Sequence, residues 1–223
     1  MIDRKFEFII FDMIGTTIRD SYNGDSLIID SFLKAFALNG IRVTYKEINK
    51  QRGIIKKEAI NNILSGQKLK HDQGDKIYLD FIDVLNNFLT DMAEIEGASD
   101  VFRLLKDSGI KVGLGSGLPK DLMIRIIINA GWQPEEFNYI GSSEDFGRGR
   151  PDPAMIIYSM AKLKIENKSR VLKVGDTIAD IQEGKNAGVL TAGVITGTQS
   201  REELRKYEPD YIFTDIRDII SLI

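Results

Sequence analysis

The sequence predicts an α/β protein with a doubly wound, mostly parallel, Rossmann-like sheet and an inserted helical cap domain. Three observations predict this class. First, the apolar run from Phe8 to Phe11 ends in a lone acid, Asp12, as buried strands of open α/β sheets do. Second, the region from Tyr22 to Ala93 has helical periodicity only. Third, strand and helix patterns alternate regularly from Gly97 onward.

The alternating region completes the predicted sheet. Short apolar runs bounded by turn residues predict strands at 111–115, 139–141, 171–174, 191–195 and 211–213. Amphipathic segments between them predict helices at 99–108, 121–130, 152–163, 178–187, 202–207 and 216–222. Because strands alternate with helices, we expect right-handed crossovers and a ligand site along one edge of the sheet.

The inserted region reads as a cap made of helices. The periodicity predicts helices at 27–38, from Thr44 to about Gly53, at 56–64 and at 77–89, with a polar loop at 67–75. Thr44 and Glu47 have the spacing of a capping box. We therefore expect a core domain of residues 1–20 and 94–223, a cap domain of residues 21–93, and hinges near 19–25 and 94–98.

Composition limits the function. The 223 residues carry a formal net charge of -3, so we expect no nucleic-acid partner. The absence of Cys excludes disulfides and thiolate metal sites, and the single His leaves little for a His-based zinc site or a Ser-His-Asp triad. No apolar run is long enough to span a bilayer and no signal pattern opens the chain, so we expect a cytoplasmic protein without a membrane partner. A processed precursor is the alternative.

Two strand ends carry carboxylates. Asp12 is followed by Gly15 and Thr16, whose backbone N–H groups could bind an anion. Asp176 and Asp180 follow another apolar run and could face the same point near Asp12. Two carboxylates about 4 Å apart repel by roughly 4 kcal/mol at an effective dielectric near 20, and an all-oxygen site suits Mg²⁺. The alternative is a helix cap and an exposed acid.

Two further loops contain groups that suit phosphate. Ser116 and Gly117 follow the apolar run at 111–115, where a hydroxyl and nearby N–H groups could bind a phosphate oxygen. Arg148 and Arg150 lie in a loop punctuated by glycine and proline before a helix. Turn chemistry explains the first loop equally well, and solvated arginines explain the second.

With these four motifs in order, the chain resembles the haloacid dehalogenase superfamily over essentially its full length. The resemblance implies that Asp12 is the nucleophile that takes a phosphoryl group and that Ser116 binds phosphate. It also implies that Arg150 contacts the transferring group. Asp12, Asp176, Asp180 and the backbone carbonyl of Ile14 would then bind Mg²⁺.

Ile14 stands where most phosphatases of this superfamily have a general acid. Loss of such an acid typically costs a factor of about 10² to 10⁴ in ester hydrolysis. Asp12 to Thr17 instead resembles the phosphonatase-like branch of the superfamily, except that Ile14 replaces Ala. In phosphonoacetaldehyde hydrolases of that branch, a cap lysine forms an imine with the aldehyde, so no leaving oxygen needs a proton.

The cap-lysine pattern Gly-x-x-Lys of that branch falls on Gly53 to Lys56. A neutral Lys56 at pH 7 needs its pKa lowered from about 10.4 to about 7.5, or roughly 4 kcal/mol of burial or cationic neighbours. The alternative is a solvated lysine beside Lys57. Two positions depart from the pattern: Ala59 replaces His, and Arg52 replaces Met and could bind a second anionic group.

The sequence therefore predicts a Mg²⁺-dependent hydrolase that cleaves a small phosphorylated or phosphonate metabolite through an aspartyl-phosphate intermediate. The preferred reaction converts phosphonoacetaldehyde to acetaldehyde and phosphate through a Schiff base on Lys56. A small-metabolite phosphomonoesterase is the first alternative, and a weakly catalytic phosphometabolite sensor is the second. The resemblance also allows a homodimer joined through the cap.

Overall fold

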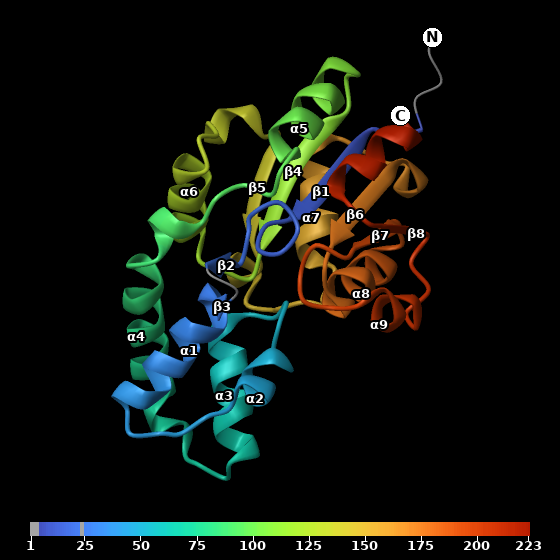
Figure 1. The fold of residues 1–223 in the computed structure, drawn as a ribbon. Helices are drawn as coiled ribbons and strands as arrows, with labels where there is room; N and C mark the ends of the chain where they lie inside the picture. Colours follow the sequence, from blue (N-terminus) through green and yellow to red (C-terminus); the bar gives the residue numbers. More distant parts are fainter. Residues whose placement is uncertain (1–4, 23–24) are drawn as a thin grey trace.

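The computed structural model describes residues 5–22 and 25–223, and its centre is a six-stranded parallel sheet (Figure 1). The strand order is β5-β4-β1-β6-β7-β8, with every neighbouring pair parallel. The strands are β1 (Phe8–Asp12), β4 (Lys111–Ser116), β5 (Tyr139–Ser142), β6 (Val171–Gly175), β7 (Leu190–Val194) and β8 (Tyr211–Phe213). The predicted doubly wound sheet is confirmed.

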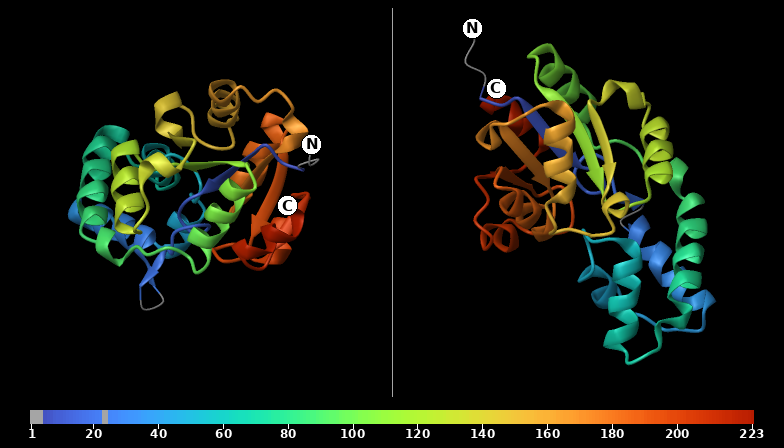
Figure 2. Two further views of the ribbon diagram at one scale, coloured as in Figure 1. Left: turned by 90° about the horizontal axis from the view of Figure 1, so that it is seen from above. Right: turned by 180° about the vertical axis from the view of Figure 1, so that it is seen from behind.

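Helices cover both faces of this sheet (Figure 2). They are α5 (Ala98–Asp107), α6 (Lys120–Asn129), α7 (Ala154–Leu163), α8 (Ile178–Ala187) and α9 (Arg201–Arg205). Side chains of β1 alternate between two apolar clusters. Phe8 and Ile10 pack with Met155 of α7, whereas Phe11 packs edge-to-face on Phe102 of α5 at 5.4 Å between ring centroids. This burial on both faces explains the uninterrupted apolar run of β1.

Residues 27–91, in the chain between β1 and β4, form a group of helices beyond the carboxyl ends of the strands (Figure 1). We call residues 27–91 the helical insertion. Its helices are α1 (Leu27–Leu38), α2 (Tyr45–Asn49), α3 (Lys56–Gly66) and α4 (Gly74–Asn86). Thr44 and Glu47 form the expected capping box on α2. The rings of Phe32 in α1 and Phe81 in α4 pack at a tilt within the insertion, with 4.4 Å between their centroids.

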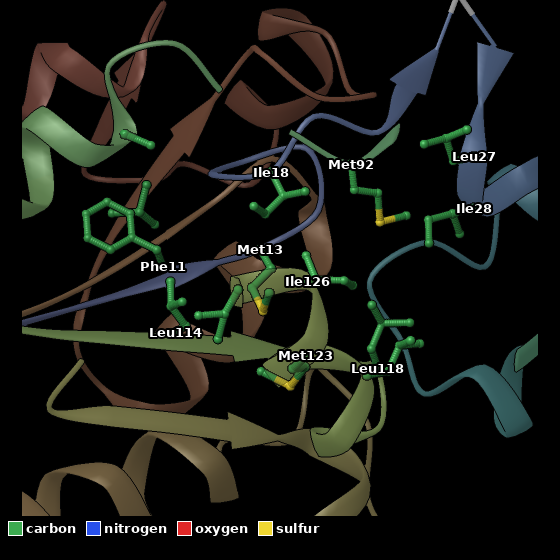
Figure 3. Close-up of a cluster of buried hydrophobic side chains, with 14 of the residues drawn as sticks. Phe11, Met13, Ile18, Leu27, Ile28, Met92, Leu114, Leu118, Met123 and Ile126 are labelled. Carbon is green, nitrogen blue, oxygen red and sulfur yellow. The ribbon is translucent and has the colours of Figure 1, made fainter. Parts of the chain in front are cut away.

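The helical insertion shares one apolar cluster with the sheet. Leu27 and Ile28 of α1 lie in the same cluster as Met13, next to the first strand, and Leu118, next to β4 (Figure 3). Burial of such apolar surface stabilises the contact between the two parts of the molecule by roughly 25 cal/mol per Å². The insertion is therefore packed on the loops at the carboxyl ends of β1 and β4.

Some local predictions were wrong. A short antiparallel pair, β2 (Ser21–Tyr22) and β3 (Asp25–Ser26), lies where the sequence predicts no strand, because two-residue strands have no periodicity to detect. The segment Ile216–Leu222 is a 3-10 helix, and the predicted loop at 67–75 contains a 3-10 turn and the start of α4. The 3-10 helices are His71–Gln73, Leu89–Asp91, Pro134–Glu136, Ser143–Phe146, Lys168–Arg170 and Ile216–Leu222. Within residues 5–22 and 25–223, no helix is long and apolar enough to cross a membrane.

Candidate active site

Polar side chains meet where the three central strands end. Asp12 ends β1, Ser116 ends β4, and Asp176 directly follows β6. Because β1 lies between β4 and β6, these side chains share one end of the sheet. Asp12 and Ser116 are 5% and 3% exposed and Asp176 is fully buried. The predicted meeting of the strand ends is therefore present in the structure.

A tight turn follows Asp12. Gly15 has a φ of +95°, and a Cβ at this position would lie 2.6 Å from Oδ2 of Asp176, so the turn requires glycine. The Gly15 N–H donates to the carbonyl of Ile18, and the Thr16 N–H donates to that of Met13. Both N–H groups thus already donate within the turn, and their predicted contact with an anion stays a prediction. The Thr16 hydroxyl instead donates to Oδ1 of Asp176 at 3.2 Å.

Three buried carboxylates form a candidate metal centre. Asp12, Asp176 and Asp180 each offer an oxygen, and these oxygens lie within 4.8 Å of one another. Burial, reinforced by the charges of Asp12 and Asp180, raises the pKa of Asp176 to about 7. A divalent cation would offset this repulsion, and the all-oxygen donor set fits Mg²⁺. Asp180 also caps α8 through Thr177, but the alternative of an exposed acid is wrong because both acids of the pair are fully buried.

We expect Mg²⁺ to raise the melting temperature, and to do so more at about pH 8 than at about pH 6. The raised pKa of Asp176 means that the folded state holds a proton between about pH 4 and about pH 7 that the unfolded state lacks. The metal-free protein therefore loses stability as pH rises through this window, and the cation restores it. Differential scanning fluorimetry with and without Mg²⁺ measures both effects.

The matched controls for this prediction are Asp176→Asn and Asp100→Asn. Asp176→Asn removes a carboxylate of the candidate centre and should abolish the response to Mg²⁺. Asp100 lies on the surface of α5, where it pairs with Arg103, so Asp100→Asn should keep the response. An undiminished response in Asp176→Asn would contradict the assignment of the metal centre.

Arg150 is a buried cation that contacts two of these carboxylates. Its Nη1 lies 2.6 Å from Oδ1 of Asp12 and 3.0 Å from Oδ1 of Asp180, and its Nη2 donates to the carbonyl of Gly115 at 3.0 Å. Burial alone would lower the pKa of this guanidinium, but the neighbouring carboxylates raise it above its usual value. Arg148 is exposed and lies near Asp152, so only one of the two loop arginines enters the site.

Sequence reasoning gave no role in the site to two further charged residues. Lys173 in β6 and Glu183 in α8 are buried and lie against Asp180 and Arg150. A lysine inside an otherwise apolar strand was the available signal, because buried charges need partners.

A small cavity of about 40 Å³ lies over Asp12, between the sheet and the helical insertion. Its lining on the sheet side includes Asp12, Ser116, Gly117, Arg150 and Thr177. Its lining on the other side includes Ile28, Ile29, Phe32, Ile48, Gln51, Arg52, Gly53 and Lys56, and Ile14 lines it from the turn after β1. This volume holds about three water molecules, which suits a small ligand.

Lys56 lines this cavity from the first residue of α3. It is only 8% exposed, whereas the neighbouring Lys57 is exposed and pairs with Asp75. The alternative of a solvated Lys56 is therefore wrong. Burial lowers the pKa of the Lys56 amine to about 8, against the opposing charge of Asp12.

Arg52 also lines the cavity, but its guanidinium already has partners. Nη1 lies 2.6 Å from Oδ2 of Asp20, Nη2 donates to Oγ of Ser26 at 2.7 Å, and Nε donates to Oδ1 of Asn49 at 3.0 Å. These contacts connect the cavity wall to the chain segment that leads into the helical insertion. The predicted contact of Arg52 with a second anion stays a prediction.

The loop before α3 rests directly on the loops of the sheet. A Cβ on Gly53 would lie 2.8 Å from Oγ1 of Thr177, and one on Gly117 would lie 2.7 Å from the carbonyl oxygen of Ile54. A Cβ on Gly149 would lie 2.9 Å from the backbone nitrogen of Ile55. Gly117 and Gly149 thus allow the backbone of the loop before α3 to approach closely, and Gly53 allows the approach of the Thr177 side chain, which closes the cavity around Lys56.

Gly117→Ala should weaken this closure. The added methyl group meets the backbone of Ile54, which cannot rotate away as a side chain could, so the loop before α3 must shift. We expect kcat/KM for phosphate release to fall roughly 100-fold, because a displacement of about 1 Å has this effect in other active sites. Steady-state kinetics and the melting temperature together measure the change.

Gly66→Ala is the matched control for Gly117→Ala. Gly66 ends α3, and a Cβ there would meet nothing within 4 Å. Gly66→Ala should therefore leave kcat/KM unchanged. An unchanged kcat/KM in Gly117→Ala would show that closure of the cavity does not depend on the contact between Gly117 and Ile54.

Comparison with known sequences shows the family of this chain. Residues 9–194 match the model of the haloacid dehalogenase-like hydrolase family. A phosphonoacetaldehyde hydrolase of Bacillus cereus is 29% identical over 98% of this chain and 87% of its own length. Another, from a second Bacillus cereus strain, is 30% identical over 87% of this chain and 77% of its own length.

Solved structures share the fold. A phosphonoacetaldehyde hydrolase-like protein from Oleispira antarctica superimposes with a TM-score of 0.86 and 24% identity, covering 98% of this chain and 91% of its own. A hydrolase from Pseudomonas syringae has a TM-score of 0.86 and 16% identity, covering 96% of each chain. The family match covers most of the sequence and includes each of the strand-end acids. The chain belongs to the haloacid dehalogenase-like hydrolases and is an enzyme of that family.

Proposed function

We propose that the protein is a Mg²⁺-dependent phosphonatase that cleaves phosphonoacetaldehyde, or a closely related carbonyl phosphonate, into an aldehyde and phosphate. The observation that carries the proposal is the buried Lys56 amine in the same small cavity as Asp12. A phosphoryl acceptor and an amine that can form an imine are the two groups that this reaction needs. The relatives named phosphonoacetaldehyde hydrolase support the same substrate.

The environment of Lys56 supports imine formation near neutral pH. At pH 7, a pKa of about 8 leaves about one amine in ten unprotonated, against about one in three thousand at the ordinary value of 10.5. The unprotonated amine is the form that attacks a carbonyl carbon. Burial thus increases the reactive fraction of Lys56 by a factor of roughly 300.

The proposed reaction begins at the aldehyde. The Lys56 amine adds to the carbonyl carbon and water leaves, which gives a protonated imine. A carboxylate oxygen of Asp12 then attacks phosphorus, the carbon–phosphorus bond breaks, and its electron pair moves into the carbon skeleton to form an enamine. Protonation at carbon and hydrolysis release acetaldehyde and the free amine, and a second water hydrolyses the aspartyl-phosphate to phosphate.

Several groups would stabilise charge on the phosphoryl group. The Arg150 guanidinium already contacts Asp12, so it lies beside the attacking oxygen. The hydroxyl of Ser116 lines the same cavity and could donate to a phosphoryl oxygen. When bound to Asp12, Asp176 and Asp180, Mg²⁺ would neutralise negative charge near the reacting phosphorus.

The cavity lining favours carbon–phosphorus cleavage over ester hydrolysis. Among the described lining residues, Asp12 is the one carboxylate, and Ile14 lines the cavity at the sequence position where most phosphatases of the superfamily have a general acid. An enamine leaving group needs no such donor at the moment of cleavage. A small-metabolite phosphomonoesterase, in which water or a residue of the helical insertion would replace the lost acid, is the alternative.

Substrate comparison tests this proposal. With Mg²⁺, the protein should release equal amounts of phosphate and acetaldehyde from phosphonoacetaldehyde. Ethyl phosphate and hexose phosphates should react slower by roughly 10² to 10⁴-fold, because no acid protonates their leaving oxygen. Coupled assays for phosphate and acetaldehyde measure both products. Faster release from the esters would favour the phosphomonoesterase instead.

A further inference from the structure

Four buried charges form a closed ring beneath the reacting carboxylate. Arg150 Nη1 lies 3.0 Å from Oδ1 of Asp180, and Lys173 Nζ lies 3.0 Å from the same oxygen. Arg150 Nε lies 3.2 Å from Oε2 of Glu183, and Lys173 Nζ lies 3.3 Å from that oxygen. Positive and negative groups therefore alternate around the ring. We call these four residues the charge ring.

The local sequence makes the charge ring possible. Asp180 and Glu183 lie three residues apart on α8, so both face β6, where Lys173 projects from the middle of the strand. A Cβ on Gly184 would lie 2.5 Å from Cγ2 of Thr191 and 3.1 Å from Cβ of Lys173, so glycine lets α8 approach the sheet. The side chains of the ring are at most 2% exposed, and two cations balance two anions.

The charge ring holds two groups of the active site in place, the guanidinium of Arg150 and the carboxylate of Asp180. Each nitrogen of the Arg150 guanidinium has a fixed neighbour: Glu183 at Nε, Asp12 and Asp180 at Nη1, and the Gly115 carbonyl at Nη2. Without Glu183 the guanidinium could turn about its long side chain. Without Lys173, Asp180 would keep Arg150 as its one ring partner and could shift toward it.

We propose that Lys173 and Glu183 are positioning residues for phosphoryl transfer, which hold Arg150 and Asp180 in register with Asp12. Neither side chain lines the cavity, so neither is expected to touch substrate. Their effect passes through the guanidinium that lies against Asp12 and through an acid of the candidate metal centre. The proposal rests on Asp12 as the phosphoryl acceptor in the proposed function, and it does not depend on the choice of leaving group.

A double variant separates positioning from simple charge balance. Lys173→Met and Glu183→Gln each leave an unmatched buried charge and should lower the melting temperature. Combined, they remove one cation and one anion, so the melting temperature should return to near that of the wild type. If the ring positions Arg150, kcat should still be lower by about 100-fold, with KM changed much less. Recovery of kcat together with the melting temperature would overturn the proposal.

Two further variants complete the test. Glu183→Asp keeps the charge but shortens the side chain, so it should fold and lose about 10-fold or more in kcat. A wild-type kcat in Glu183→Asp would also overturn the proposal. Glu7→Gln with Arg170→Met is the matched control, because this pair at 3.0 Å lies just before β1 and β6, at the opposite end of the sheet. It should leave kcat unchanged.

Orthovanadate binding gives a readout that does not depend on the substrate. This phosphate-shaped anion needs the same positioned guanidinium, so calorimetry in the presence of Mg²⁺ should give a Kd for the double variant raised by about 10-fold or more. An unchanged Kd would overturn the proposal. If wild-type protein binds orthovanadate but does not cleave phosphonoacetaldehyde, the proposed substrate fails while the role of the charge ring is still measured.

Discussion

Lys56→Arg should lower the rate of phosphonoacetaldehyde cleavage by about 10⁴-fold or more, since removal of a covalent nucleophile has effects of this size or larger. Arginine keeps the positive charge and much of the side-chain volume but cannot supply an unprotonated amine at neutral pH. The phosphoryl acceptor Asp12 is untouched, so the loss isolates imine formation. Phosphate release under saturating substrate measures the change.

Lys57→Arg is the matched control for Lys56→Arg. Lys57 is the next residue of α3, but its side chain is exposed and pairs with Asp75. Lys57→Arg should retain wild-type activity. Retention of activity in Lys56→Arg would contradict the imine mechanism.

In the wild type, kcat/KM should rise with pH and level off above about pH 8, because deprotonation of Lys56 creates the reactive amine.

Asp12→Asn should abolish phosphate release from every substrate, with a fall of roughly 10⁴ to 10⁶-fold. The amide is nearly the same size as the carboxylate but cannot attack phosphorus. Burial raises the pKa of Asp12, so replacing its charge with a neutral group should not destabilise the fold. Phosphate release and the melting temperature measure these two outcomes.

The same variant separates the two halves of the reaction. Because Lys56 remains, Asp12→Asn should still form an imine with phosphonoacetaldehyde even though the carbon–phosphorus bond stays intact. Asp100→Asn on the surface of α5 should behave as the wild type. Turnover in Asp12→Asn at more than a trace would mean that another group accepts the phosphoryl unit.

The strand ends could be predicted from the sequence because buried parallel strands leave a strong apolar pattern. Asp12 and Asp176 each follow such a run, and parallel strands bring their carboxyl ends together whatever the intervening length of chain. The sequence predicted the meeting of Asp12 with Asp180 from a helical spacing of four residues after Asp176, although Asp176 lies before the N-cap Thr177 and only Asp180 is in α8. The sequence left two alternatives for Lys56, a buried amine or a solvated one. The pattern Gly-x-x-Lys does not determine the direction in which a lysine in the first turn of a helix points.

Other features depend on contacts far apart in the sequence. Glu183 lies in α8 and Arg150 in the loop before α7. No local sequence pattern predicts that their side chains approach within 3.2 Å. The sequence suggested that Arg52 could bind a second anionic group of the substrate. In the structure, its guanidinium donates to Asp20, which lies 32 residues earlier in the chain. The division into domains and a homodimer joined through the helical insertion both stay predictions.

Borohydride reduction is the measurement that tests the central claim most directly. Wild-type protein incubated with phosphonoacetaldehyde and then reduced should lose activity irreversibly and carry a stable secondary amine. Mass mapping of the peptides should locate that amine at Lys56, and Lys57 should be unmodified. Absence of an adduct at Lys56 while cleavage proceeds would contradict the account.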